Sequence, residues 1–227
     1  MRLLAIDTAL EACAAAVFDS ERGGIIASES LPMKRGHAEA LMPLVARVMD
    51  EAHAEFAELA RIVVTVGPGS FTGLRVGISA ARGIALASNR PAIGLSTLAA
   101  YAAPHVAADE TTAIVAAIDA RHGQVYFQVF GGGGRTLVPP RVAPIRDAVR
   151  AAMASPTLIV GSAAEAVRAE WPAGEPPPLL VNAQPAPDIA WIARLGAAAA
   201  ATDVPPRPLY LQAPDAKPQD AARLPRQ

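Results

Sequence analysis

The beginning of the chain contains three strand patterns in succession, with no helical pattern between them. The apolar run 3–8 (LLAIDT) is followed by 11–19 and then, after the turn-forming stretch SERGG, by the alternating segment 25–31. A dinucleotide-binding Rossmann domain would instead pass from its first strand through a Gly-rich turn into a helix. The pattern therefore predicts an antiparallel meander that opens an α/β domain, and it disfavours dinucleotide binding.

From His37 the apolar period changes to that of a helix. Leu41 and Val45 fall at helical spacing, and Met42 and Met49 form a neighbouring stripe. The resulting apolar arc is wider than packing on one surface requires. The helix is therefore expected to bury one stripe and to leave another for a partner.

The rest of the sequence alternates strands and helices and then repeats this order more loosely. The first copy continues with strand 61–67, helix 72–88, strand 90–96 and a short helix near 97–103, and the second contains a hairpin at 112–130, helix 145–153, strand 157–161, helix 162–171, strand 178–182 and helix 187–201. A meander followed by αβαβ is the ribonuclease-H-like order. We therefore expect two such lobes, residues 1–105 and 106–212, and a disordered Pro-rich tail, residues 213–227.

The Gly-rich stretch VTVGPGSFTGLRVGISAARG resembles a phosphate loop only superficially. A P-loop needs the pattern GxxxxGK[ST], and no lysine lies between Lys34 and Lys217. The pattern GxGxxG also fails, because Gly67, Gly69 and Gly73 are two and four residues apart. A helix N-terminus with a weak preference for an anion remains as one alternative.

The other alternative for this stretch is structural. Gly67 and Gly69 flank Pro68 and permit a sharp strand-to-helix turn, and Ser70 or Thr72 can cap the helix that follows.

The helix after this turn carries small residues at four-residue spacing. Gly73, Gly77 and Ala81 leave one side smooth, although each interior glycine costs about 1 kcal/mol relative to alanine. Such a surface permits close approach of another element, and the sequence leaves open whether that element belongs to this chain or to a partner.

The charge balance argues against direct binding of nucleic acid. The chain has 20 Lys and Arg against 21 Asp and Glu, a formal net charge of -1. A protein that binds nucleic acid without a partner usually has an excess of basic residues or a basic stripe on its surface. If RNA is involved, another component is expected to hold it.

The single cysteine and the hydropathy pattern limit the class of protein further. Cys13 alone cannot form an intrachain disulfide, and a cysteine-based zinc site is disfavoured. No apolar run reaches the length of a membrane span. We expect a soluble cytoplasmic protein, with Cys13 as a small buried side chain.

Asp7 and Asp119 each end an apolar strand at the start of a lobe. In actin-like folds such residues face the cleft between lobes and hold a metal–nucleotide, whereas the plain alternative is a carboxylate that caps a turn. The four histidines form neither HExxH nor HxxxH, and Ser70 lacks the GxSxG arrangement of a nucleophile elbow. We expect no metal, no cofactor and no catalytic set.

Several segments together resemble the TsaB (YeaZ) family of the bacterial tRNA threonylcarbamoyladenosine (t6A) machinery. They are LLAIDTALEACAAAVFD, RGHAEALMPLV, VTVGPGSFTGLRVGISAARGIALA, RPAIGLSTLAAYA, DARHGQVYFQVF and PLYLQAPDAKPQ. The resemblance implies an actin-like (ASKHA) fold and a non-catalytic scaffold for TsaD. TsaD transfers threonylcarbamoyl to N6 of adenosine 37 in tRNAs that read ANN codons, and TsaE is a small ATPase that joins the complex.

In this family the helices of the first lobe form a bundle with TsaD, and members also self-associate. The resemblance therefore implies a surface for TsaD or a second copy at His37, Leu41, Met42, Val45, Met49, Gly73, Gly77 and Ala81. tRNA would be bound only through the complex.

Two positions suggest that the transfer activity is absent. The resemblance places Thr97 and Tyr101 where TsaD has a metal-binding HxxxH, and these hydroxyls do not replace imidazoles as ligands of iron or zinc. The resemblance therefore implies an inactive paralogue. The alternatives are an actin-like ATPase or kinase that uses Asp7 and Asp119, a peptidase, and a direct tRNA-binding module.

Overall fold

The computed structural model describes residues 1–107, 111–200, 202 and 204–212. The first of two sheets has the order β3-β2-β1-β4-β5. Its strands are β1 (Arg2–Asp7), β2 (Ala12–Asp19), β3 (Gly24–Pro32), β4 (Arg61–Gly67) and β5 (Ala92–Ser96). The first three pair antiparallel, and β4 and β5 continue the sheet in parallel from β1. The predicted meander is confirmed.

The second sheet repeats this arrangement, with the order β10-β9-β6-β7-β8. Its strands are β6 (Ala113–Asp119), β7 (Gln124–Phe130), β8 (Thr136–Pro144), β9 (Thr157–Val160) and β10 (Leu180–Asn182). β6 occupies the place of β1, with an antiparallel pair on one side and two parallel strands on the other. The fold is therefore α/β and actin-like, built from two ribonuclease-H-like lobes.

One strand, β8, was not predicted from the sequence, and it contains prolines. Pro139 and Pro140 lack an N–H for the ladder, and a proline pair inside a sheet would normally argue against a strand. β8 lies at the edge of its sheet, and its pairing with β7 is irregular around these residues. An edge strand tolerates both features, because the unpaired side faces away from the ladder.

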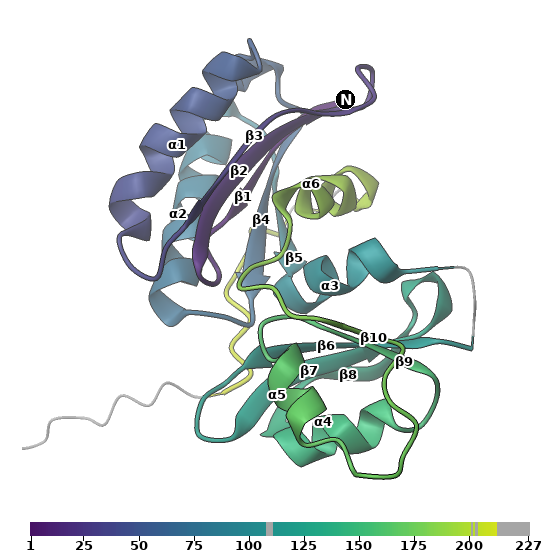
Figure 1. Ribbon diagram of the computed structural model, residues 1–227. Coiled ribbons are helices and arrows are strands. Elements are labelled where there is room, and N and C mark those ends of the chain that lie inside the picture. Colours follow the sequence, from purple (N-terminus) through teal and green to yellow (C-terminus); the bar gives the residue numbers. More distant parts are fainter. Residues whose placement is uncertain (108–110, 201, 203, 213–227) are drawn as a thin grey trace, which may run out of the picture.

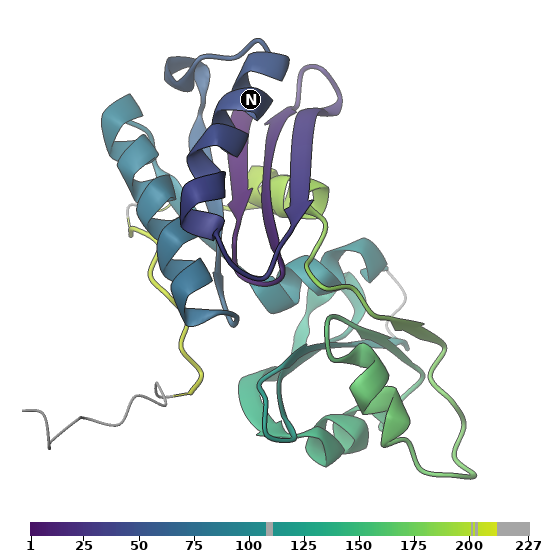
Figure 2. The same ribbon diagram turned by 60° about the vertical axis from the view of Figure 1, so that its left-hand side comes forward.

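The helices complete the layers of each lobe (Figure 1). α1 (His37–Glu51) and α2 (Phe71–Ser88) lie together on one face of the first sheet, and α6 (Ile189–Ala198) covers the other face (Figures 1 and 2). α4 (Ile145–Ala152) and α5 (Ala164–Ala169) cover the outer face of the second sheet, and α3 (Thr97–Ala102) covers its inner face. Short 3-10 turns occur at Phe56–Glu58, Ala103–His105 and Gly132–Gly134.

Two helices cross between the lobes, which corrects the predicted division at residue 105. α6 was assigned to the second lobe, but Ile192 and Ala193 pack on Leu3 of the first sheet. α3 was assigned to the first lobe, but Leu98 packs on Ile118 of the second sheet. α3 thus follows the strands of the first sheet but packs on the second sheet. α6 follows the strands of the second sheet but packs on the first. The predicted disorder of residues 213–227 concerns a segment outside the described residues.

In the part of the chain that the structure describes, no helix is both long and apolar enough to cross a bilayer.

Candidate partner-binding surface

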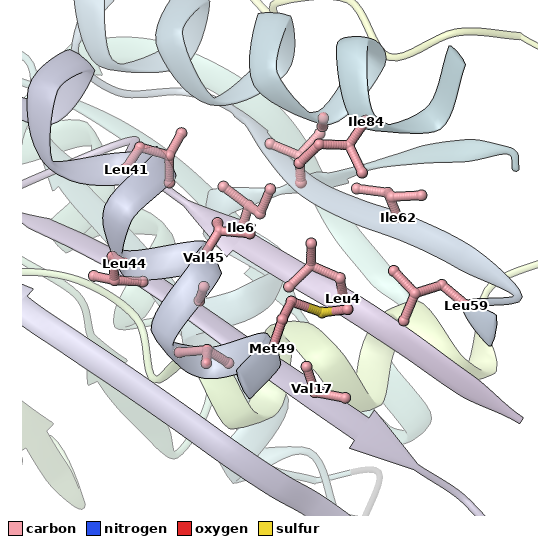
Figure 3. Packing of buried hydrophobic residues seen from close by; sticks show 14 of the residues in the cluster. Leu4, Ile6, Val17, Leu41, Leu44, Val45, Met49, Leu59, Ile62 and Ile84 are labelled. Atoms are coloured by element: carbon pink, nitrogen blue, oxygen red, sulfur yellow. The ribbon is translucent and has the colours of Figure 1, made fainter. Parts of the chain in front are cut away.

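The buried side of α1, which includes Met49 of the second predicted stripe, belongs to the core of the first lobe. Leu41, Val45 and Met49 are 1%, 0% and 3% exposed and pack in one cluster with Leu4 and Ile6 of β1. Figure 3 shows these side chains between α1 and the sheet. The expectation that they contact a partner is therefore wrong, because the sheet already covers them.

His37 also faces inward. Its side chain is buried, and Nε2 lies 3.0 Å from the carbonyl oxygen of Leu10. This contact ties the first residue of α1 to the connection between β1 and β2. The expected partner role of His37 is corrected to that of an internal anchor.

The small-residue stripe of α2 permits close approach within the chain. A Cβ atom added to Gly73 would overlap the carbonyl oxygen of Thr8, and one added to Gly77 would overlap the hydroxyl oxygen of Thr8. That hydroxyl donates to the carbonyl of Gly73 over 2.7 Å. Ala81 is fully buried in the same core. These three positions are therefore internal contacts, and their expected exposure to a partner is wrong.

The turn before α2 fits around the connection between β1 and β2. Gly67 has a φ of 115°, which side-chain-bearing residues rarely adopt, and its peptide bond to Pro68 is cis. Pro68 is buried. A Cβ atom on Gly69 would overlap the carbonyl oxygen of Ala9. The glycines thus serve the close packing of two turns.

Ser70 is the residue that caps α2. Its Oγ accepts the N–H of Gly73 at 3.3 Å, and its own N–H donates to the carbonyl of Ala9 at 2.7 Å. Thr72 is exposed and does not cap the helix. Because these polar groups have partners inside the chain, the structural alternative is favoured over an anion site.

The surface available to a partner lies on the opposite side of the two helices. Met42 is 47% exposed, Phe71 40% and Leu86 85%. We use the name outer helical surface for the exposed apolar and small residues of α1 and α2 taken together: Met42, Pro43, Ala46, Phe71, Gly83, Leu86 and Ala87. Met42 was among the predicted partner residues, whereas Phe71 and Leu86 were missed. The alternation of buried and exposed positions along α2 could have identified them.

Asp7 lies inside the first lobe. Its Oδ1 accepts the hydroxyl of Thr65 at 2.5 Å and the N–H of Ala9 at 3.0 Å. Its Oδ2 is buried without a hydrogen-bond partner. Burial raises the pKa of this carboxyl above its ordinary value, against the smaller opposing effect of the hydrogen bonds.

Asp119 has a different environment at the exposed end of β6. Its Oδ1 accepts the N–H of Arg121 at 2.8 Å, as a turn-capping carboxylate does. Asp119 therefore matches the plain alternative. The carboxylate of Asp7 is buried, and that of Asp119 caps a turn. The two therefore do not form the exposed pair that a metal–nucleotide would require.

The positions compared with a metal-binding histidine pair lie buried on α3. The hydroxyl of Tyr101 donates to the carbonyl of Gln184 at 2.8 Å, and burial raises the pKa of Tyr101, which keeps the phenol protonated. The hydroxyl of Thr97 is buried without a partner. Among the described residues, no three His, Cys, Asp or Glu side chains gather as a metal site would require. These residues do not fit a bound metal.

A pocket of about 130 Å³ lies beside α3, between the two lobes. Tyr101, His105, Asn182 and Asp188 contribute polar groups to its lining. Asn182 Nδ2 lies 3.4 Å from His105 Nε2, and Asp188 accepts the N–H of Ala190 at the start of α6. Each of these four side chains thus has a polar contact within the chain.

Comparison with known proteins links this architecture to one family. The model of the family described as tRNA N6-adenosine threonylcarbamoyltransferase, TsaD, matches residues 14–173. The TsaB protein of Escherichia coli K12, described as a tRNA threonylcarbamoyladenosine biosynthesis protein, is 38% identical over 127 residues, which are 56% of this chain and 54% of that protein. The match thus spans about half the length of such curated relatives. An uncharacterized protein of Mycobacterium tuberculosis is 34% identical over 95% of this chain and 94% of its own length.

Solved structures agree over nearly the whole chain. A Pseudomonas aeruginosa protein described as similar to peptidase YeaZ has 30% identity and a TM-score of 0.77, covering 93% of this chain and 99% of its own. YeaZ from Pseudomonas aeruginosa has 29% identity and a TM-score of 0.72, covering 86% and 90%. Since the family model, the curated relatives and these structures coincide, the chain belongs to the TsaD family of actin-like proteins and, within it, to the TsaB (YeaZ) group.

Proposed function

We propose that this chain is a non-catalytic scaffold subunit in t6A biosynthesis. It binds a TsaD-type catalytic subunit and supports transfer of threonylcarbamoyl to N6 of adenosine 37 in tRNAs that read ANN codons. TsaE joins the complex, and tRNA is held by the complex rather than by this chain. The names of the curated relatives support the pathway.

The observation that carries the proposal is the identity and burial of the two residues that the resemblance aligns with the metal ligands of TsaD. Thr97 and Tyr101 occupy them, both are buried, and the phenol of Tyr101 stays protonated. Imidazole and carboxylate ligands suit iron and zinc, whereas neutral hydroxyls do not. A copy of the fold with these residues retains the architecture without the metal chemistry.

The outer helical surface supplies the binding part of the proposal. It exposes Met42, Phe71 and Leu86 on two adjacent helices of a fold that TsaD shares. Contiguous exposed apolar patches mark protein–protein interfaces, and we propose that these side chains belong to one such patch. The net charge of -1 supports a protein partner over direct contact with tRNA.

Calorimetric titration with the TsaD of the same organism tests this proposal. The double substitution Met42→Glu and Leu86→Glu places two charges on the outer helical surface without touching the core, so we expect at least about tenfold weaker binding. Leu179→Glu is the matched control, because Leu179 is 63% exposed on the second lobe. Equal affinity of the double variant and the control would contradict the proposed surface.

The same surface is proposed to mediate self-association of the free chain. An isologous contact between two copies uses the same patch on both, and a paralogue of similar fold can occupy that patch instead. Sedimentation should then show that TsaD dissociates any dimer of this chain. A ternary assembly, in which TsaD binds the intact dimer, would contradict a shared surface.

The alternative of an actin-like ATPase or a peptidase has less support. Asp7 is sealed inside the first lobe, and the side chain of Ser70 caps a helix. Titration of the isolated chain with magnesium-ATP distinguishes the proposals. Tight binding, with hydrolysis that is lost in Asp7→Asn, would replace the scaffold by an enzyme.

A further inference from the structure

The segment 204–212, after α6, lies against the carboxyl ends of β4 and β5. Figure 2 shows it passing beside α2. The N–H of Leu209 donates to the carbonyl of Val66 at 2.7 Å. Pro206 is buried, and its Cβ lies 3.2 Å from the position of a Cβ on Gly94. The missing side chain of Gly94 thus leaves room for the proline, and the segment covers a part of the sheet that α2 leaves open.

The same segment completes a cluster at the exposed start of α2. The ring of Tyr210 lies 5.3 Å from that of Phe71, centroid to centroid. The guanidinium of Arg75 lies 3.7 Å above the Phe71 ring, and its Nε donates to the hydroxyl of Tyr210 at 3.2 Å. Cation–π and aromatic contacts of this kind fix side chains that would otherwise sample several rotamers. Tyr210 therefore helps to position the side chains of Phe71 and Arg75 at the start of α2.

The end of the segment reaches the second lobe. The hydroxyl of Tyr126, on β7, lies 3.4 Å from Oε1 of Gln212. Within nine residues, then, the chain contacts β4 and β5, the start of α2, and a strand of the other lobe. A segment that is anchored on two bodies restricts their relative motion.

We propose that residues 204–212 form a strap that holds the two lobes in one relative orientation and orders the exposed start of α2. The anchors are few, and Val204, Arg207 and Tyr210 are exposed. Segments with few buried contacts open at lower free energy than the sheets on which they lie. The strap therefore undocks without unfolding of either lobe, and undocking loosens both the lobe orientation and the Phe71–Arg75 pair. This inference concerns the isolated chain and is independent of the proposed partner.

Hydrogen–deuterium exchange and small-angle X-ray scattering of the isolated full chain test the strap. Leu209→Pro removes the N–H that bonds to Val66, and Tyr210→Ala removes the ring that packs on Phe71. In both variants we expect amide exchange in residues 70–75 to accelerate by about tenfold or more, and the radius of gyration to increase. Arg207→Ala is the control, since it truncates an exposed side chain of the same segment, and it should behave as the unchanged chain does.

Two outcomes decide the proposal. If both variants exchange and scatter as the unchanged chain does, the segment is a passive tail and the proposal is wrong. If Leu209→Pro fails to fold, Tyr210→Ala carries the test, because it removes only a partly exposed ring. Faster exchange at residues 70–75 in Tyr210→Ala alone, absent in Arg207→Ala, would still support the strap.

Discussion

At the scale of single residues, the Gly-rich motif serves packing between two turns and a helix. Gly73 and Gly77 admit the backbone and hydroxyl of Thr8, and Ser70 caps the helix whose stripe they form. The sequence could predict the turn, the cap and the smooth stripe. It could not predict what packs on the stripe, because that depends on the position of Thr8 in the folded sheet.

Substitution of Gly73 tests this packing. Gly73→Ala would place a methyl group on the carbonyl of Thr8, so we expect it to destabilise the chain by about 1–3 kcal/mol. Gly83→Ala is the matched control on the same helix, with no atom within 4 Å of the added group. It should stabilise the helix by up to about 1 kcal/mol. Urea unfolding measures both, and equal effects of the two substitutions would contradict the assigned contact.

The buried carboxyl of Asp7 predicts a pH dependence of stability. Its pKa in the folded chain is raised above the ordinary 3.8 by burial, so between these two values the folded chain binds a proton that the unfolded chain has lost. The stabilisation is complete below pH 3.8 and is lost as the pH rises through the folded pKa.

Comparison with Asp7→Asn isolates this effect. The free energy of unfolding of the unchanged chain, minus that of the variant, should fall as the pH rises from about 4 toward neutrality. Urea unfolding at a series of pH values gives this difference. A difference that stays constant, or that increases with pH, would show that the carboxyl is solvated or paired with a cation.

At the scale of elements, α1 shows what periodicity can and cannot decide. Its wide apolar arc predicted a helix that buries one stripe and leaves another for a partner, and the helix starts at the predicted His37. The stripe that faces the sheet contains Leu41 and Val45, whereas Met42 is exposed. Periodicity alone could not choose between adjacent stripes of similar hydropathy. The sequence pattern also gave no sign of β8, whose prolines are acceptable because the strand lies at the edge of its sheet.

Two neighbouring residues of α1 separate core from surface. Leu41→Ala removes a side chain that is 1% exposed, and we expect it to cost about 2–5 kcal/mol of unfolding free energy. Met42→Ala, one residue further, should change stability by less than about 0.5 kcal/mol. Thermal or chemical denaturation measures both, and a larger cost for Met42 would reverse the assigned orientation of α1.

At the scale of the whole molecule, two similar lobes are joined by an exchange of helices. The repeated element order revealed the lobes in the sequence, and the two sheets have the predicted order. The exchange was not predictable, because α3 and α6 each have apolar residues that would suit either sheet. It places α3, with Thr97 and Tyr101, between the two sheets.

Reconstituted tRNA modification tests the scaffold proposal most directly. The assay supplies the threonylcarbamoyl adenylate and an ANN-reading tRNA to TsaD and TsaE, with this chain, without it, or with the variant Met42→Glu, Leu86→Glu. We predict t6A only when TsaD and the unchanged chain are both present, and little with the variant. Formation of t6A by this chain in the absence of TsaD would contradict the account.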